Sequence, residues 1–226
     1  MNTRLNTRKR GAVFFRVLSY HPPSWSPLCL AKSSSSKNEN RVRIIGGRWR
    51  GRKIAFPDGE GLRPTGDRIR ETLFNWLMPV LPEARCLDLF AGSGALGFEA
   101  LSRGAAHCVM LERNSYAARS LQATRQLLGA DAISQVVAAD ALSWLQAATG
   151  CFDVVFIDPP FADAQLSPAV FVEQLQQRAL LSDDPWIYVE QPANIPLSPP
   201  QGFMTYRQQR AGLVQYGLWR RAENIL

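Results

Sequence analysis

Residues 88–97 read Asp-Leu-Phe-Ala-Gly-Ser-Gly-Ala-Leu-Gly and decide how the chain folds. They place a Gly-x-Gly-x-x-Gly pattern between an apolar run typical of a buried strand and a stretch with helical periodicity. In that context Gly92, Gly94 and Gly97 let the backbone turn tightly and approach a ligand at the start of the helix. We therefore predict that these glycines and Ser93 bind a nucleotide-like cofactor and do not form an ordinary strand-to-helix turn.

Around this motif, strand-like apolar runs alternate with helical stretches. Strands are expected at residues 86–90, 108–111, 136–138, 154–157 and 186–189, and helices at 96–102, 117–128, 141–148 and 168–178. Repeated strand–helix units predict a parallel sheet covered on both faces. Residues 203–209 and 214–220 are separated only by a turn containing Ala211-Gly212, so they must pair antiparallel at one edge. The expected fold is α/β and Rossmann-like, with a mostly parallel seven-stranded sheet and an antiparallel C-terminal hairpin.

A shorter pair of strands is expected before this core. Residues 42–45 and 49–54 have strand-like patterns, and the Gly46-Gly47 dipeptide between them favours a tight hairpin. Asp67 is the predicted N-cap of a helix that ends near Pro79. The hairpin segment is rich in cations, which are Arg41, Arg43, Arg48, Arg50, Arg52 and Lys53.

The charge of the chain is unevenly distributed. Residues 1–53 hold 13 of the 26 lysines and arginines but only one of the 19 acids, whereas residues 54–226 hold 13 bases and 18 acids. A basic segment on an acidic body indicates a polyanionic partner; the alternative is a solvated, disordered tail. We expect residues 1–40 to be a disordered basic extension, either an organelle transit peptide or, as we favour, a dispensable bacterial extension. Residues 41–226 then form one domain, with a basic hairpin and helix at 41–80 and a core at 84–226.

Three acids near the expected strand ends bear on the identity of the cofactor. Asp88 lies four residues before Gly92, where a carboxylate would repel the pyrophosphate of NAD but suits the cationic amino-acid end of S-adenosylmethionine (AdoMet). Glu112 can accept hydrogen bonds from ribose hydroxyls. Asp140 can contact the adenine amino group, although capping the following helix explains it equally well. The acids favour AdoMet over a dinucleotide.

The sharpest motif is the tetrapeptide Asp158-Pro159-Pro160-Phe161, directly after the strand expected at 154–157. Strand ends at the middle of such a sheet form the ligand crevice, so this motif should face the same cofactor as the glycine loop. An exocyclic amine on a base is a poor nucleophile and must be held so that its lone pair points at the methyl group. The Asp158 carboxylate and the Pro159 carbonyl supply two acceptors, Pro160 stiffens the turn, and Phe161 can stack on the base.

Several other classes of protein are disfavoured. The only histidines are His21 and His107, which argues against triad hydrolases and histidine metal sites, and we expect no metal. The chain contains no Gly-x-x-x-x-Gly-Lys-Ser/Thr phosphate loop. Its four cysteines show no Cys-x-x-Cys spacing, and no apolar run is long enough to cross a membrane. We expect a cytoplasmic protein with reduced thiols.

With these residues in view, the chain resembles the bacterial 16S rRNA (guanine-966-N2)-methyltransferase family over essentially all of residues 41–226. The matching stretches are residues 43–53, 63–76, 88–97 and 158–161. The resemblance implies a class I methyltransferase fold, AdoMet as methyl donor, and one guanine N2 of small-subunit RNA as the target. It also implies that the region around Arg63 closes over cofactor and RNA, with Thr65 and Arg68 as contacts.

Given this resemblance, we expect the basic hairpin to contact RNA. The expected partner is 16S rRNA or an assembling small subunit, and the enzyme is expected to be a monomer. Trp49 can stack on a base, although packing against its own domain is the commoner role of such a tryptophan. The nearest rival is an amino-methyltransferase of the same fold that acts on adenine N6 or on a protein amide. A nicotinamide oxidoreductase leaves residues 158–161 unexplained, and a noncatalytic RNA-binding module leaves the glycine loop unexplained.

Overall fold

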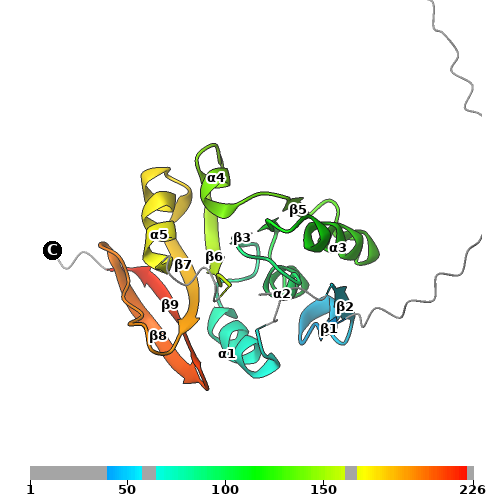
Figure 1. The fold of residues 1–226 in the computed structure, drawn as a ribbon, viewed down its shortest axis with the longest axis horizontal. Helices are drawn as coiled ribbons and strands as arrows, with labels where there is room; N and C mark the ends of the chain where they lie inside the picture. The colour runs from blue at the N-terminus through cyan, green and yellow to red at the C-terminus, as the bar shows by residue number, and fades with distance from the viewer. Residues whose placement is uncertain (1–39, 58–64, 161–166, 223–226) are drawn as a thin grey trace, which may run out of the picture. The chain divides into compact units, whose positions relative to one another are not determined.

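The computed structural model describes residues 40–57, 65–160 and 167–222, so residues 1–39 of the expected basic extension lie outside it (Figure 1). The elements follow one another as β1 (Asn40–Arg43), the 3-10 turn η1 (Gly47–Trp49), β2 (Lys53–Phe56), α1 (Asp67–Leu77), β3 (Arg85–Asp88), α2 (Ala95–Ser102), β4 (His107–Leu111), α3 (Ser115–Leu127), β5 (Ser134–Val137), α4 (Ala141–Leu145), β6 (Phe152–Ile157), α5 (Pro168–Gln177), β7 (Leu181–Pro192), β8 (Phe203–Ala211) and β9 (Val214–Arg221). None of the helices in the described ranges is long and apolar enough to cross a membrane.

The described strands form a seven-stranded sheet in the order β5-β4-β3-β6-β7-β9-β8, and a separate two-stranded hairpin of β1 and β2. Strands β3 to β7 run parallel, whereas β9 is antiparallel to both β7 and β8. The predicted mixed sheet with an antiparallel C-terminal edge is therefore confirmed. Strand β7 is longer than the predicted 186–189 because it pairs with both β6 and β9 along its length.

Helices cover both faces of this sheet. Side chains alternate between the faces along each strand, so that Cys86 and Phe156 join one core cluster and Leu87 and Val155 join the other. The first cluster includes residues of α1, α2, α3 and the β1–β2 hairpin, and the second includes residues of α4 and α5. The arrangement is the helix–sheet–helix sandwich expected from the alternating pattern (Figure 1).

The N-terminal hairpin forms, but the predicted tight turn at Gly46-Gly47 is wrong. Both strands lie farther from the predicted turn, the second is shorter than predicted, and residues 44–52 make a loop that contains η1. The backbone N–H groups of Ile45 and Gly46 donate to the Glu99 carboxylate at 2.7 and 2.8 Å, and that of Trp49 donates to Ser102 Oγ at 2.9 Å. Helix α2 therefore supplies acceptors that the opposite strand would supply in a regular hairpin.

Helix α1 begins where the sequence predicts, but its N-cap is Gly66 and not Asp67. The Asp67 carboxylate accepts a hydrogen bond from Arg70 Nη2 at 2.7 Å, within the first turn. An ion pair with a guanidinium one turn later competes with the capping geometry, which explains the difference.

Candidate active site

The carboxyl ends of β3, β4 and β6 bring the predicted site residues together. In the sheet order, β3 lies between β4 and β6, so the chain crosses to opposite sides of β3. Such a switch point leaves a crevice above the strand ends. Asp88 ends β3, Glu112 directly follows β4 and Asp158 directly follows β6.

The glycine loop has the backbone geometry that its sequence predicts. Gly92 and Gly94 have φ values of 51° and 79°, in the left-handed region, and Gly94 is the N-cap of α2. At Gly97 an added Cβ would lie 2.7 Å from Met110 Sδ, so a larger residue would require the Met110 side chain to move. Ser93, which lies between Gly92 and Gly94 in the sequence, is buried. The N-terminus of an eight-residue helix therefore opens onto the crevice.

Asp88 is buried and bonded to this loop. Its Oδ2 accepts from the Gly97 N–H at 3.2 Å and its Oδ1 from the Phe90 N–H at 3.4 Å. Burial, with a smaller contribution from the negative charge of Asp158, raises the pKa of Asp88 to about 7. Each carboxylate oxygen has two lone pairs, so the side chain keeps acceptor capacity for a ligand.

Glu112 ties β4 to the glycine loop, since its two oxygens accept from the backbone N–H groups of Gly92 at 2.9 Å and Asn114 at 2.7 Å.

Asp140 does not contact the glycine loop in the hydrogen bonds of the described residues; it caps a helix. Its Oδ1 accepts from the Ser143 N–H at 2.9 Å as the N-cap of α4. The structure therefore shows the capping role, one of the two roles that the sequence predicted for Asp140. The contact with adenine stays a prediction.

Asp158 lies against a residue far away in the sequence. Thr65 Oγ1, just before α1, donates to Asp158 Oδ2 at 2.9 Å. Burial raises the pKa of Asp158, and the hydrogen bond from Thr65 acts in the opposite direction. Pro159 is buried beside it. Phe161 and Arg63, which we also predicted at the site, lie outside the described residues.

Comparison with known proteins places the chain in a family. A family model described as Conserved hypothetical protein 95 matches residues 42–220. The ribosomal RNA small subunit methyltransferase D of Escherichia coli K12 is 42% identical over 191 residues, which is 84% of this chain and 95% of that protein. The protein of the same name from Haemophilus influenzae is 40% identical over 194 residues, 84% of this chain and 100% of its own length. The chain belongs to this methyltransferase family.

Solved structures agree with the assignment to the methyltransferase D family. A methyltransferase from Escherichia coli superimposes with a TM-score of 0.72 at 42% identity, covering 80% of this chain and 98% of that one. A more distant likeness, to an RNA methyltransferase from Salinibacter ruber in complex with S-adenosyl-L-homocysteine, has a TM-score of 0.54 at 14% identity and shows the fold alone. The predicted class I methyltransferase fold is confirmed.

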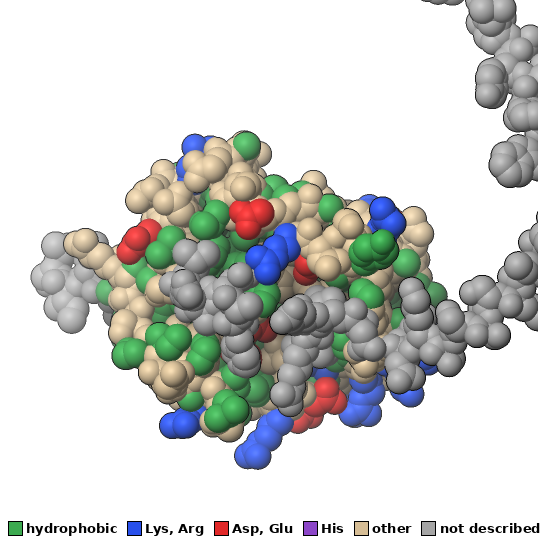
Figure 2. Space-filling view, in the orientation of Figure 1, with side chains coloured by type: hydrophobic (Ala, Val, Ile, Leu, Met, Phe, Trp, Pro, Cys, Tyr) green, Lys and Arg blue, Asp and Glu red, His purple; other side chains and the backbone are tan. Residues whose placement is uncertain are grey.

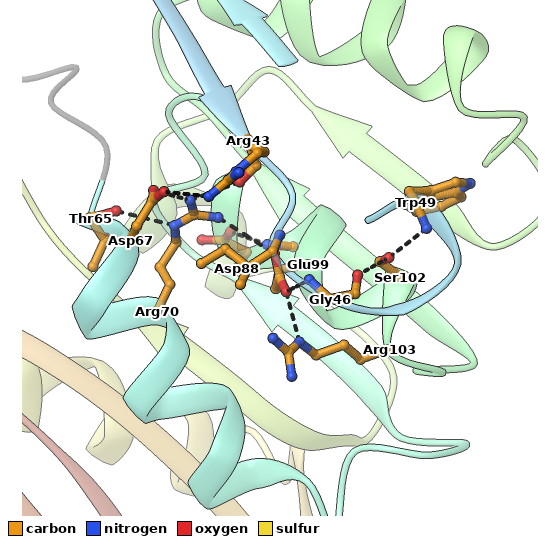
Figure 3. Close-up of polar contacts among 12 residues, drawn as sticks. Arg43, Gly46, Trp49, Thr65, Asp67, Arg70, Asp88, Glu99, Ser102 and Arg103 are labelled. Carbon is orange, nitrogen blue, oxygen red and sulfur yellow. Dashed lines mark hydrogen bonds and ion pairs between the residues drawn. The ribbon is translucent and has the colours of Figure 1, made fainter. Parts of the chain in front are cut away.

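A buried ion-pair network fixes the basic hairpin of this chain to the core (Figure 3). Arg70 and Glu99 are fully buried, with Arg70 Nη1 3.5 Å from Glu99 Oε2, and Arg103 Nε lies 2.7 Å from Glu99 Oε1. Arg70 Nη2 also donates to the Arg43 carbonyl at 2.8 Å. Arg70 lies in the matching stretch 63–76 and Glu99 just after the stretch 88–97, but their pairing could not be inferred because 29 residues separate them.

The predicted RNA contacts divide into two groups. Exposed cations are Arg41, Arg43, Arg48, Arg50, Arg52, Lys53 and Arg68. Figure 2 shows several Lys and Arg side chains along the lower edge of the face drawn, where Figure 1 places α1 and the hairpin. Trp49, by contrast, is only 9% exposed, and Arg48 lies 4.2 Å from its ring centroid. Trp49 therefore packs within the hairpin core, which is the role that the sequence favoured over stacking on a base.

Two further residues of the crevice were not predicted from the sequence. Glu190 and Tyr188 lie on β7, and Tyr188 Oη donates to Glu190 Oε2 at 2.7 Å. The signal was the run Trp-Ile-Tyr-Val-Glu at 186–190, in which a charged residue directly follows the strand predicted at 186–189. In the described ranges no cluster of His, Cys, Asp or Glu side chains is arranged to hold a metal ion.

Proposed function

We propose that this chain transfers a methyl group from AdoMet to the exocyclic N2 amine of a guanine in 16S ribosomal RNA. The observation that carries the proposal is the placement of Asp158 and Pro159 at the end of β6, beside the glycine loop that follows β3. Relatives that share 40–42% of their residues with the chain are named ribosomal RNA small subunit methyltransferases. The finer choice of guanine N2 rests on the matching sequence stretches.

The residues of the crevice suit a cationic cofactor. The negative charge of Asp158 raises the pKa of Asp88, in addition to the effect of burial. A ligand that carries an ammonium and a sulfonium relieves this repulsion, whereas the pyrophosphate of NAD would add to it. Asp88 would hold the amino-acid end of AdoMet and Glu112 the ribose. When bound, AdoMet supplies an activated methyl group whose departure needs no metal.

The base would be held by the turn after β6. The Asp158 carboxylate and the Pro159 carbonyl accept the two N–H groups of the exocyclic amine, which orients the nitrogen lone pair toward the methyl group. Thr65 donates to Asp158 Oδ2 and so fixes the orientation of the carboxylate. Positioning of this kind supplies much of the rate when the nucleophile is weak.

The RNA would dock on the exposed cations of the hairpin and on Arg68 at the start of α1. Contacts with Glu99 and Ser102 hold the hairpin against α2, and the ion pair of Arg43 with Asp67 joins it to the start of α1. An enzyme that modifies a base must take that base out of its stack, so an unpaired guanine is the more accessible target. We expect a monomer that acts in the cytoplasm, where ribosomal subunits assemble.

The test is methyl incorporation from labelled AdoMet into small subunits isolated from cells that lack this enzyme. Free 16S RNA, large subunits, DNA and total protein serve as parallel acceptors. Label confined to small-subunit RNA and recovered as N2-methylguanine supports the proposal. Label recovered as N6-methyladenine, or on protein, would overturn the substrate and leave the family assignment intact.

A further inference from the structure

Glu190 lies beside Asp158 in the sheet. Strands β6 and β7 pair in parallel with Ile157 opposite Val189, so Asp158 and Glu190 are the next residues on the two strands. Neighbouring strands are about 4.8 Å apart, and residues at equivalent positions point to the same face. Asp158 therefore shares a face with Glu190 and with Tyr188, which is paired with Phe156. This is the face that α1 and α2 cover.

The Glu190 carboxylate is enclosed and only half satisfied. The residue is 7% exposed, and Tyr188 Oη donates to Oε2 at 2.7 Å. In residues 40–57, 65–160 and 167–222 no donor reaches the other oxygen, Oε1. Burial and the negative charge of Asp158 raise the pKa of Glu190, while the Tyr188 hydrogen bond lowers it. Oε1 is not among the fully buried side-chain atoms that lack a partner, so it stays accessible and can accept a hydrogen bond from a ligand.

The chemistry of the bases indicates which donor fits. Guanine presents N1–H directly beside its exocyclic N2 amine, and both groups are donors. Adenine presents N1 as an acceptor beside its N6 amine. An acceptor next to the residue that holds the amine therefore accepts from guanine and repels adenine.

We propose that Glu190 Oε1 accepts the N1–H of the target base and so selects guanine over a base whose N1 is an acceptor. This inference rests on the proposed function, because it assumes that Asp158 holds the N2 amine. Tyr188 is a positioning residue that orients the Glu190 carboxylate through Oε2. The pair of neighbouring acids then has two tasks, since Asp158 holds the reacting amine and Glu190 identifies the base.

The experiment compares two bases at the target position in reconstituted small subunits: guanine, and 2-aminopurine, which keeps the N2 amine but has an unprotonated N1. The wild-type enzyme should methylate guanine with a kcat/KM at least about 100-fold higher, as expected of a buried polar group that loses its partner. Glu190→Gln replaces the acceptor with an amide that can donate to N1 of 2-aminopurine. The ratio should therefore fall by about tenfold or more, with AdoMet binding retained.

Glu190→Asp keeps a carboxylate and is the matched variant. It should lower kcat/KM for both bases while it preserves the preference for guanine. The inference is overturned if Glu190→Gln binds AdoMet but keeps the wild-type ratio, or if Glu190→Asp loses the preference. If Glu190→Gln does not fold, Glu190→Ala, which also removes the acceptor, takes its place, and a wild-type ratio in that variant overturns the inference. Failure of the wild-type enzyme to methylate guanine in small subunits would instead remove the proposed function.

Discussion

Asp158 is the residue on which methyl transfer depends most directly in the proposed site. Asp158→Asn keeps the shape of the side chain but removes its charge and one acceptor. We expect kcat to fall by about 100-fold or more, because the amine loses its alignment, while AdoMet still binds. Single-turnover methylation and calorimetry with S-adenosylhomocysteine measure the two effects separately.

Asp153→Asn is the control, since Asp153 lies at the opposite end of β6 and accepts from the Arg85 N–H at 2.9 Å. It should leave kcat unchanged. A parallel loss of cofactor binding in Asp158→Asn would contradict the assignment of Asp158 to the base.

Asp88 should make cofactor binding depend on pH. Its pKa is raised to about 7, so the carboxyl is largely neutral at pH 6 and ionised at pH 8. The ammonium group at the amino-acid end of the ligand binds the ionised form, and affinity therefore rises with pH. We expect S-adenosylhomocysteine to bind about tenfold more tightly at pH 8 than at pH 6, the change that one proton with this pKa produces.

Calorimetry across that range checks the prediction, with Asp88→Asn as the matched variant. The substitution should weaken binding at pH 8 and flatten the profile. An unchanged slope in Asp88→Asn would assign the titration to another acid of the crevice. The stability of the ligand-free protein should change with pH in the opposite direction to cofactor affinity. Because the pKa of Asp88 is raised in the folded state, its contribution to stability falls as pH increases from about 4 toward 7.

At the scale of elements, the loop between β1 and β2 is shaped by the helix beneath it. Gly47 has a φ of +72°, and an added Cβ would lie 1.8 Å from the Ser102 carbonyl oxygen. Gly51 has a φ of +83° but open space around it. Gly47→Ala should therefore cost about 2 kcal/mol more unfolding free energy than Gly51→Ala, which bears only the backbone strain.

Urea denaturation of the two variants measures the difference. If the hairpin moves instead of destabilising the domain, Gly47→Ala should keep its affinity for S-adenosylhomocysteine and lose affinity for RNA. Equal costs for the two substitutions would mean that η1 does not pack on α2 as described.

At the scale of the whole molecule, the basic hairpin contrasts with the acidic body of the chain. If its six cations contact phosphates, affinity for RNA should fall about a thousandfold between 50 and 200 mM salt. Replacing Arg48, Arg50 and Arg52 together with Gln should lower the slope of log affinity against log salt by about three. Fluorescence anisotropy with a 16S RNA fragment measures both quantities.

Arg178→Gln is the control for this experiment, because Arg178 is exposed at the end of α5 and so belongs to the opposite face of the sheet. The slope of log affinity against log salt for Arg178→Gln should equal that of the wild-type protein. An unchanged slope in the triple variant would mean that the RNA contacts a surface other than the hairpin.

The sequence by itself determined the order and type of nearly all elements, the mixed sheet and the glycine loop. These features follow from local patterns: strands repeat every two residues, helices every 3.6, and Gly92, Gly94 and Gly97 mark a turn that other residues fit poorly. Asp158-Pro159 was identified for the same reason, since its chemistry is contained in adjacent residues.

Only the tertiary structure decided which distant side chains meet. Thr65 and Asp158 are 93 residues apart, and Glu190 lies beside Asp158 only because β7 pairs with β6 in one register. The hairpin turn was mispredicted because α2 supplies partners to its backbone from outside the local segment, and the N-cap of α1 because Asp67 pairs with Arg70 within the helix. Local periodicity fixes the direction of a side chain relative to its own element, whereas strand order and register decide its neighbours.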